Sequence, residues 1–133
     1  MTDDSGNALL PIEPTNILYR RGRPKKFLNP DGSVSSRVFA LREKDNGQLS
    51  IDIASLCKPI DAITARGEFS PDQFWLASIS VADVHSLNLE AFCQPLTVAQ
   101  HNVENPAHGF IWGMQLDDDI LPGLLARKSR RVL

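Results

Sequence analysis

The sequence predicts an α+β fold, in which a mostly antiparallel sheet packs against two or three short helices. Apolar and polar residues alternate over residues 49–53, which is typical of a half-buried strand. Turn-forming clusters separate the strand candidates, at residues 29–32 (Asn-Pro-Asp-Gly) and 44–47 (Lys-Asp-Asn-Gly). Every helical pattern is short. The 133 residues are enough for one hydrophobic core, and we see no internal repeat.

Six strand candidates follow one another along the chain. They cover residues 16–19, 34–41 (a strand or an irregular arm), 49–53, 74–79, 89–95 and 109–114, with a polar loop over 100–108. We expect a core built from Leu18, Phe39, Ile51, Ile53, Leu56, Phe74, Leu76, Ile79, Val84, Leu87, Phe110 and Ile111.

The helix candidates carry start and stop signals. Residues 59–66 begin with a proline and are followed by Gly67. Ser80 can cap a helix over residues 81–87, and residues 120–128 form the third candidate, with Pro122 in its first turn. Residues 1–15 are acidic and proline-containing, so we expect a mobile N-terminal leader before a single domain at 16–133.

Bulk composition points to a folded protein of the cytoplasm. The apolar fraction of 42% and the charged fraction of 23% are ordinary for a globular domain. No apolar run approaches the length of a membrane span, so we expect no membrane partner. Cys57 and Cys93 fit neither a disulfide framework nor a metal-site spacing, which favours free thiols in a reducing compartment.

One basic run stands out as a candidate nucleic-acid contact. Residues 20–26 read Arg20, Arg21, Gly22, Arg23, Pro24, Lys25 and Lys26, the order of an AT-hook. Arginines gain electrostatic attraction in the narrow minor groove of AT-rich DNA, and a glycine lets the backbone approach the groove floor. We favour a structural alternative, because strand-like residues flank the run and charge protects an edge strand from aggregation.

Basic residues also gather near the C-terminus. This second group consists of Arg127, Lys128, Arg130 and Arg131. Together with the five basic residues at 20–26, it supplies nine of the 14 basic residues. If the two groups meet in space, they form a basic face that favours a polyanion; otherwise they are two solvated patches.

No local motif for catalysis is found, so we name no catalytic residue and no cofactor. The sequence lacks a phosphate-binding glycine loop, a nucleophile elbow and a cysteine–histidine signature. An enzyme or ligand-binding hypothesis starts from Arg20, Arg37 and His108 converging around an anionic ligand. His108 lies where a loop meets a strand, a common place for functional residues.

We predict no metal site. His101 and His108 do not have zinc-ligand spacing, and the three consecutive aspartates at 117–119 cannot all face one ion without an unusual turn. Acidic residues before a helix start explain those aspartates equally well.

Several segments together resemble a group of small, uncharacterised bacterial proteins. The pattern comprises Leu18-Tyr19-Arg20-Arg21, Asp31-Gly32, Ser35-Ser36-Arg37-Val38-Phe39, Leu49-Ser50-Ile51-Asp52, Ser55-Leu56 and Asn105-Pro106-Ala107-His108, within residues 17–114. This resemblance implies a bacterial source and no established activity. It also implies that the two arginines end a strand.

The leading functional hypothesis is therefore a non-enzymatic interaction or accessory protein of a bacterial cytoplasm, with an unknown protein partner. DNA binding through residues 20–26 and the basic C-terminus is one alternative. An enzyme or ligand-binding domain for an anionic ligand is the other.

Overall fold

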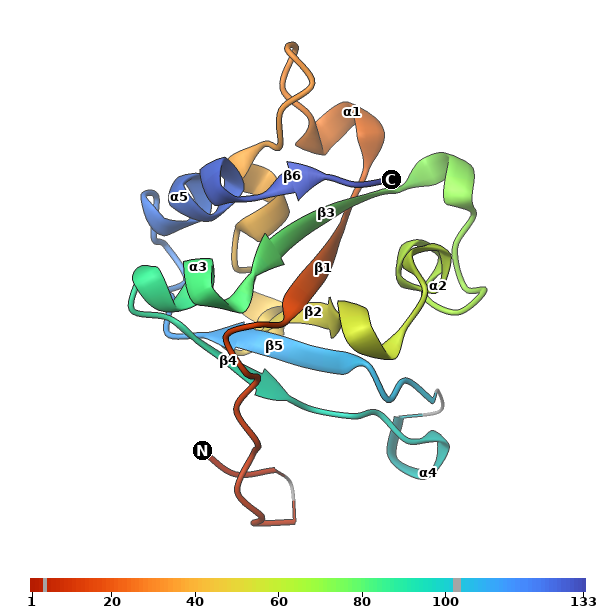
Figure 1. The fold of residues 1–133 in the computed structure, drawn as a ribbon, viewed down its shortest axis with the longest axis vertical. Helices are drawn as coiled ribbons and strands as arrows, with labels where there is room; N and C mark the ends of the chain where they lie inside the picture. The colour runs from red at the N-terminus through yellow and green to blue at the C-terminus, as the bar shows by residue number, and fades with distance from the viewer. Residues whose placement is uncertain (4, 102–103) are drawn as a thin grey trace.

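The computed structural model describes residues 1–3, 5–101 and 104–133, without the side chains of Lys25, Gln100 and His101. Six strands form one antiparallel sheet in the order β4-β5-β2-β1-β3-β6 (Figure 1). The strands are β1 (Ile17–Gly22), β2 (Leu49–Ile53), β3 (Trp75–Ser80), β4 (Glu90–Cys93), β5 (His108–Trp112) and β6 (Arg130–Arg131). Short helices surround the sheet, so the predicted α+β class is confirmed.

The helices are mostly one or two turns long. The α-helices are α1 (Pro24–Phe27), α2 (Pro59–Thr64), α3 (Val81–Ser86), α4 (Val98–His101) and α5 (Leu121–Lys128). Four 3₁₀ turns accompany them: η1 (Ser36–Phe39), η2 (Glu43–Asp45), η3 (Ala54–Leu56) and η4 (Pro71–Gln73). Within the described part of the chain, no helix has the length and hydrophobicity that crossing a bilayer requires.

The sheet divides into two halves that are joined over a short distance. β1 pairs with β3 along six residues but with β2 at only two positions, Leu18↔Ile53 and Tyr19↔Asp52. Figure 1 shows the consequence, since β1 and β3 run steeply while β2, β5 and β4 run across the view. Beyond Tyr19 and Asp52 the backbones of β1 and β2 separate.

The main core lies on the face of the sheet that η1, α3 and α5 cover. Leu18, Phe39, Trp75 and Leu125 are fully buried there. A smaller cluster forms where α2 packs on the opposite face, around Ile63 and Leu76. Most of the predicted core residues are buried; Leu56 is exposed, and Phe74 and Leu87 are half-buried.

The helix starts agree with the sequence signals, whereas α2 ends at Thr64, two residues before its predicted end. The Ser80 side chain accepts a hydrogen bond of 3.0 Å from the backbone N–H of Asp83, which caps α3. Pro59 occupies the first turn of α2, and Ala65 and Arg66 follow that helix with positive φ. Within the predicted strand or irregular arm at residues 34–41, Ser36–Phe39 form the 3₁₀ turn η1.

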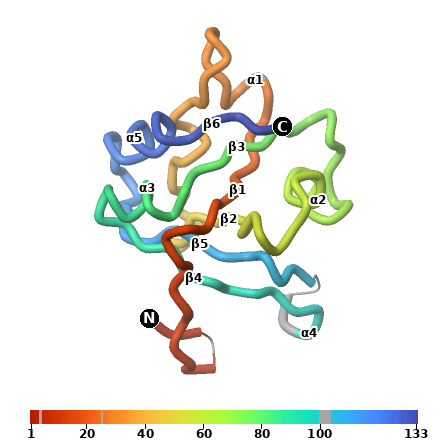
Figure 2. Tube along the Cα trace, viewed as in Figure 1, coloured from red at the N-terminus to blue at the C-terminus, as the bar shows by residue number. Residues whose placement is uncertain are grey.

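Residues 10–12, near the end of the N-terminal segment, are hydrogen-bonded to strand β4 of the sheet (Figure 2). The N–H of Ile12 donates to the carbonyl of Ala91, and the N–H of Cys93 donates to the carbonyl of Leu10. Ile12 is only 3% exposed, whereas Leu10 is 70% exposed. The mobile leader expected over residues 1–15 is therefore tied to β4 at residues 10–12.

Gly22 is needed for packing inside the fold. A Cβ atom at this position would lie 2.7 Å from two carbon atoms of the Trp75 indole ring. Because Trp75 is completely buried, the ring has no room to retreat.

Replacing Gly22 with Ala should lower the free energy of unfolding by about 1–3 kcal/mol, because the added methyl overpacks the core. Gly123→Ala is the matched control, since nothing lies within 4 Å of its Cβ position. The control should be neutral or slightly stabilising, because alanine favours the helical backbone of α5. Urea unfolding monitored by tryptophan fluorescence measures both variants. Equal stability of the two would contradict the packing role of Gly22.

Replacing Ile12 with Ala should cost about 2–5 kcal/mol of stability, the range for buried aliphatic truncations. Leu10→Ala should change stability by less than about 0.5 kcal/mol, because that side chain faces solvent. Thermal unfolding by circular dichroism compares the two. If Ile12→Ala unfolds like wild type, the segment before β1 does not contribute to the core.

Candidate anion-binding cleft

A basic cleft of about 900 Å³ lies where β1 and β2 separate. We call it the basic cleft. Eight basic residues line it: Arg20, Arg21, Arg23, Lys26, Arg37, Arg42, Lys44 and Arg66. Only Asp52 and Glu68 oppose them among the lining residues, so the lining carries a formal excess of six positive charges (8 − 2). The whole chain, by contrast, has a net charge of −2.

Arg20 spans the opening between the two halves of the sheet. Its Nε donates to the carbonyl of Val38 in η1, and its Nη1 donates to the carbonyl of Ser50 in β2, each at 2.8 Å. Burial lowers the pKa of Arg20 to about 10, a loss that Asp45 partly offsets, so the guanidinium stays charged at neutral pH. No carboxylate among the described residues forms an ion pair with it.

Arg21 points to the opposite face of β1 and meets an aromatic wall. Its Nη1 donates to the carbonyl of Ala62 at 3.3 Å, and its guanidinium lies 5.1 Å from the ring centre of Phe69. The Phe69 ring is 4.9 Å from that of Phe74, and Arg23 lies 5.7 Å from the Phe74 ring centre. Burial lowers the pKa of Arg21, while Asp52 and then Glu68 favour its charged form.

His108 reaches the cleft from the other side of the opening. Its Nδ1 lies 2.9 Å from the carbonyl of Gln94, and its Nε2 lies 3.4 Å from the Ser50 hydroxyl. Asp52 stands opposite His108 in the register of β2 and β5. Asn105 connects Asp52 with Arg66. Its Nδ2 donates to Asp52 Oδ1 at 2.8 Å, and its Oδ1 accepts from Arg66 Nε at 3.1 Å.

The three residues predicted to converge around an anion do line the same cleft. Arg20 comes from β1, Arg37 from η1 and His108 from the start of β5. The lining also includes Tyr19 and Arg21 of β1, Ser50, Ile51 and Asp52 of β2, and Asn105 just before β5.

Residues 20–26 do not form the single, unpaired extended segment that the AT-hook interpretation expects. Arg20, Arg21 and Gly22 belong to β1 and pair with Ala77, Leu76 and Trp75 of β3. Pro24 then starts α1, a helical turn that also contains Lys26 and the backbone of Lys25. The Lys25 side chain, also predicted to contact DNA, lies outside the described residues.

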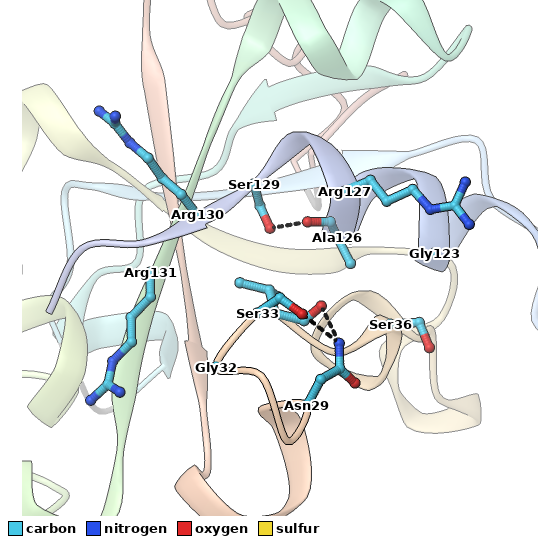
Figure 3. A pocket seen from close by; sticks show the side chains of 11 residues that line it. Asn29, Gly32, Ser33, Ser36, Gly123, Ala126, Arg127, Ser129, Arg130 and Arg131 are labelled. Carbon is cyan, nitrogen blue, oxygen red and sulfur yellow. Dashed lines mark hydrogen bonds between the residues drawn. The ribbon is translucent and has the colours of Figure 1, made fainter.

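The basic C-terminus lines a different pocket, of about 710 Å³, between the 29–36 segment and α5 and β6. We call it the C-terminal pocket. Figure 3 shows the guanidinium groups of Arg127, Arg130 and Arg131 extending outward from it in different directions. The backbones of the two basic groups lie on one sheet, since Arg20 and Arg131 both pair with Ala77, but the two groups line separate pockets. Lys128 is exposed on α5 and does not line the pocket.

The cysteines lie away from any reactive arrangement. Both are free and half-buried. Burial raises the pKa of Cys57 to about 11, with a further contribution from Asp52, and burial also raises the pKa of Cys93. Both groups are therefore neutral thiols at physiological pH. Among the described residues, no three His, Cys, Asp or Glu side chains gather as a metal cluster would.

Sequence reasoning missed Ser50 as a functional candidate. Its partner His108 is 58 positions away, and only the register of β2 and β5 brings them together. One signal was visible, because the alternation over residues 49–53 places Ser50 and Asp52 on the same face of the strand.

Comparisons with known proteins leave this geometry as the main guide to function. No family model matches the chain, and the searches of curated proteins and of solved structures found no match either.

Proposed function

We propose that this chain binds a nucleotide-containing polyanion in the basic cleft. The observation that carries the proposal is Arg20, a half-buried guanidinium that forms no ion pair with a carboxylate among the described residues and lies among seven further basic residues. A charge taken out of water is costly unless an opposite charge meets it. An anionic ligand would supply that charge.

Unused hydrogen-bond donors on Arg20 support the same conclusion. A guanidinium has five N–H donors, and Val38 and Ser50 use only those of Nε and Nη1. No described acceptor is bonded to Nη2. Guanidinium forks match the oxygens of phosphate groups, so a phosphate fits this position in shape as well as charge.

The aromatic wall favours a ligand that carries bases. The rings of Phe69 and Phe74 contact each other, and the guanidinium groups of Arg21 and Arg23 flank this pair in the cleft. Unpaired bases stack on aromatic rings and on guanidinium planes, and each stacked base contributes about 1–3 kcal/mol. The cleft volume lies within the usual range for ligand pockets, which suits a nucleotide or a short stretch of single strand.

Three other predictions from the sequence concern DNA binding, a protein partner and the cellular location. Binding in the minor groove through residues 20–26 is not supported, because those residues form a paired strand and a helical turn. The interaction-protein hypothesis stays a prediction. A bacterial cytoplasmic location also stays a proposal, supported by two free thiols and by the family resemblance.

Oligonucleotide binding tests the proposal. A fluorescently labelled single-stranded RNA should bind with a micromolar or lower Kd at low salt, and binding should weaken steeply as salt rises. The double variant Arg37→Ala with Lys44→Ala removes two exposed cleft charges. Its log–log salt slope should be shallower by about 1.4, from about 0.7 for each phosphate contact on a single strand. Fluorescence anisotropy at several salt concentrations gives both quantities.

Two control variants locate the binding. Lys58→Ala removes an exposed charge outside both pockets, and Arg127→Ala removes one at the C-terminal pocket. Both should bind as wild type does. Competition with a nucleoside diphosphate distinguishes a free nucleotide from a strand as the preferred ligand. No binding at low salt, or equal losses in the controls and the cleft variant, would contradict the proposal.

A further inference from the structure

We propose that the basic cleft is also a catalytic site, in which Ser50 attacks a phosphodiester and His108 is its general base. This inference rests on the proposed function, because it assumes that a phosphate-bearing ligand occupies the cleft. The reaction is phosphodiester cleavage, and Ser50 and His108 are the two residues that touch the reacting atoms.

The hydrogen bond to Gln94 fixes the state of the His108 ring. A carbonyl oxygen can only accept, so Nδ1, at 2.9 Å from the Gln94 oxygen, must carry the proton. In the neutral ring Nε2 is then the acceptor, and it faces the Ser50 hydroxyl at 3.4 Å. A serine whose hydroxyl faces a histidine held through its other nitrogen is the arrangement of an activated nucleophile. Such bonds are often long without substrate and shorten when substrate binds.

The sheet itself sets this geometry. Ser50, Asp52 and His108 project from one face of β2 and β5, because Asp52 pairs with His108 and Ser50 with Phe110. Sites held on paired strands keep their side chains in more accurate positions than sites on loops. Ser50 is exposed to the cleft, so its hydroxyl can reach a bound ligand.

Asp52 is placed to support the histidine. Residues directly opposite in an antiparallel pair have Cβ atoms about 5 Å apart. The Asp52 carboxylate is oriented by Asn105, which donates to its Oδ1 at 2.8 Å. A negative charge on the residue opposite His108 in the sheet would stabilise the imidazolium that forms when His108 takes a proton.

Arg20 brings positive charge to the nucleophile. Its Nη1 donates at 2.8 Å to the backbone carbonyl of Ser50, so the guanidinium lies beside the residue that carries the nucleophile. In phosphoryl transfer, most of the catalysis comes from positioning and from charge stabilisation around the phosphoryl oxygens. The unused donors of Arg20 are available for that role.

Water is the only reagent that the reaction needs besides the phosphodiester. Ser50 Oγ forms a bond to phosphorus while His108 Nε2 takes the hydroxyl proton. The bond from phosphorus to the leaving oxygen breaks, and the imidazolium returns the proton to that oxygen. Water then attacks the phosphoserine with His108 again as base, the Oγ–P bond breaks, and Ser50 regains its proton.

An activated phosphodiester, bis(para-nitrophenyl) phosphate, tests the proposal on the full chain. Wild type should release para-nitrophenolate and form a covalent adduct that peptide mass spectrometry places on Ser50. Ser50→Ala should abolish the adduct and the release. His108→Ala should slow the release by about 100-fold or more, the usual contribution of a general base. Ser86→Ala, an exposed serine on α3, is the matched control and should react as wild type does.

The same preparations are measured for oligonucleotide binding, which separates the two proposals. Wild type that binds the oligonucleotide but forms no adduct and releases no product overturns the catalytic proposal alone. Release by Ser50→Ala at the wild-type rate overturns it too. A Ser50 adduct without oligonucleotide binding supports the catalytic pair and contradicts the proposed ligand.

Discussion

The Arg20 guanidinium is the contact on which both the fold and the candidate site depend. The two halves of the sheet share only the pairs Leu18↔Ile53 and Tyr19↔Asp52. Arg20 continues the connection where the backbones separate, since it holds η1 through Val38 and β2 through Ser50. Hydrogen bonds from a charged donor contribute about 1.5–3 kcal/mol each, so this one side chain replaces part of the missing strand pairing.

Removing the Arg20 charge from water also costs free energy, and the fold offsets this cost only in part. Burial disfavours its charge, which is why its pKa falls to about 10, and no described carboxylate pairs with it. Arg42, by contrast, lies 3.7 Å from Asp45 at the rim. Charged side chains that are removed from water without an ion-pair partner often lie at functional sites. The arrangement is consistent with a positive charge kept ready for a ligand.

Local rules explain which parts of the fold were predictable. The alternation over residues 49–53 gave β2, and the Ser80 cap gave the start of α3, because both depend on neighbours in sequence. The basic run was ambiguous because its proline is compatible with two structures. Pro24 suits an extended hook, but it equally suits the first position of a helix, where its missing N–H costs nothing. Gly22 likewise suits close approach to DNA, yet here it accommodates Trp75.

The candidate site was predictable only in part, for a physical reason. Arg20, Arg37 and His108 were proposed together from residue type, and they do line one cleft. The pairing of Ser50 with His108 depends on strand register, and the divergence of β1 from β2 depends on sheet twist. Neither quantity is encoded within a short stretch of sequence. The convergence of basic residues from β1, η1 and the segments after them has the same origin.

Ligand-induced changes in backbone amide resonances test the central claim most directly. A ¹H–¹⁵N spectrum recorded during titration with a short single-stranded RNA reports on every part of the chain at once. Binding in the basic cleft predicts the largest shifts at Arg20, Arg37, Ser50 and His108, and small shifts at the C-terminal pocket. Shifts concentrated at Arg127, Arg130 and Arg131, with the cleft unchanged, would contradict the assignment of the cleft as the binding site.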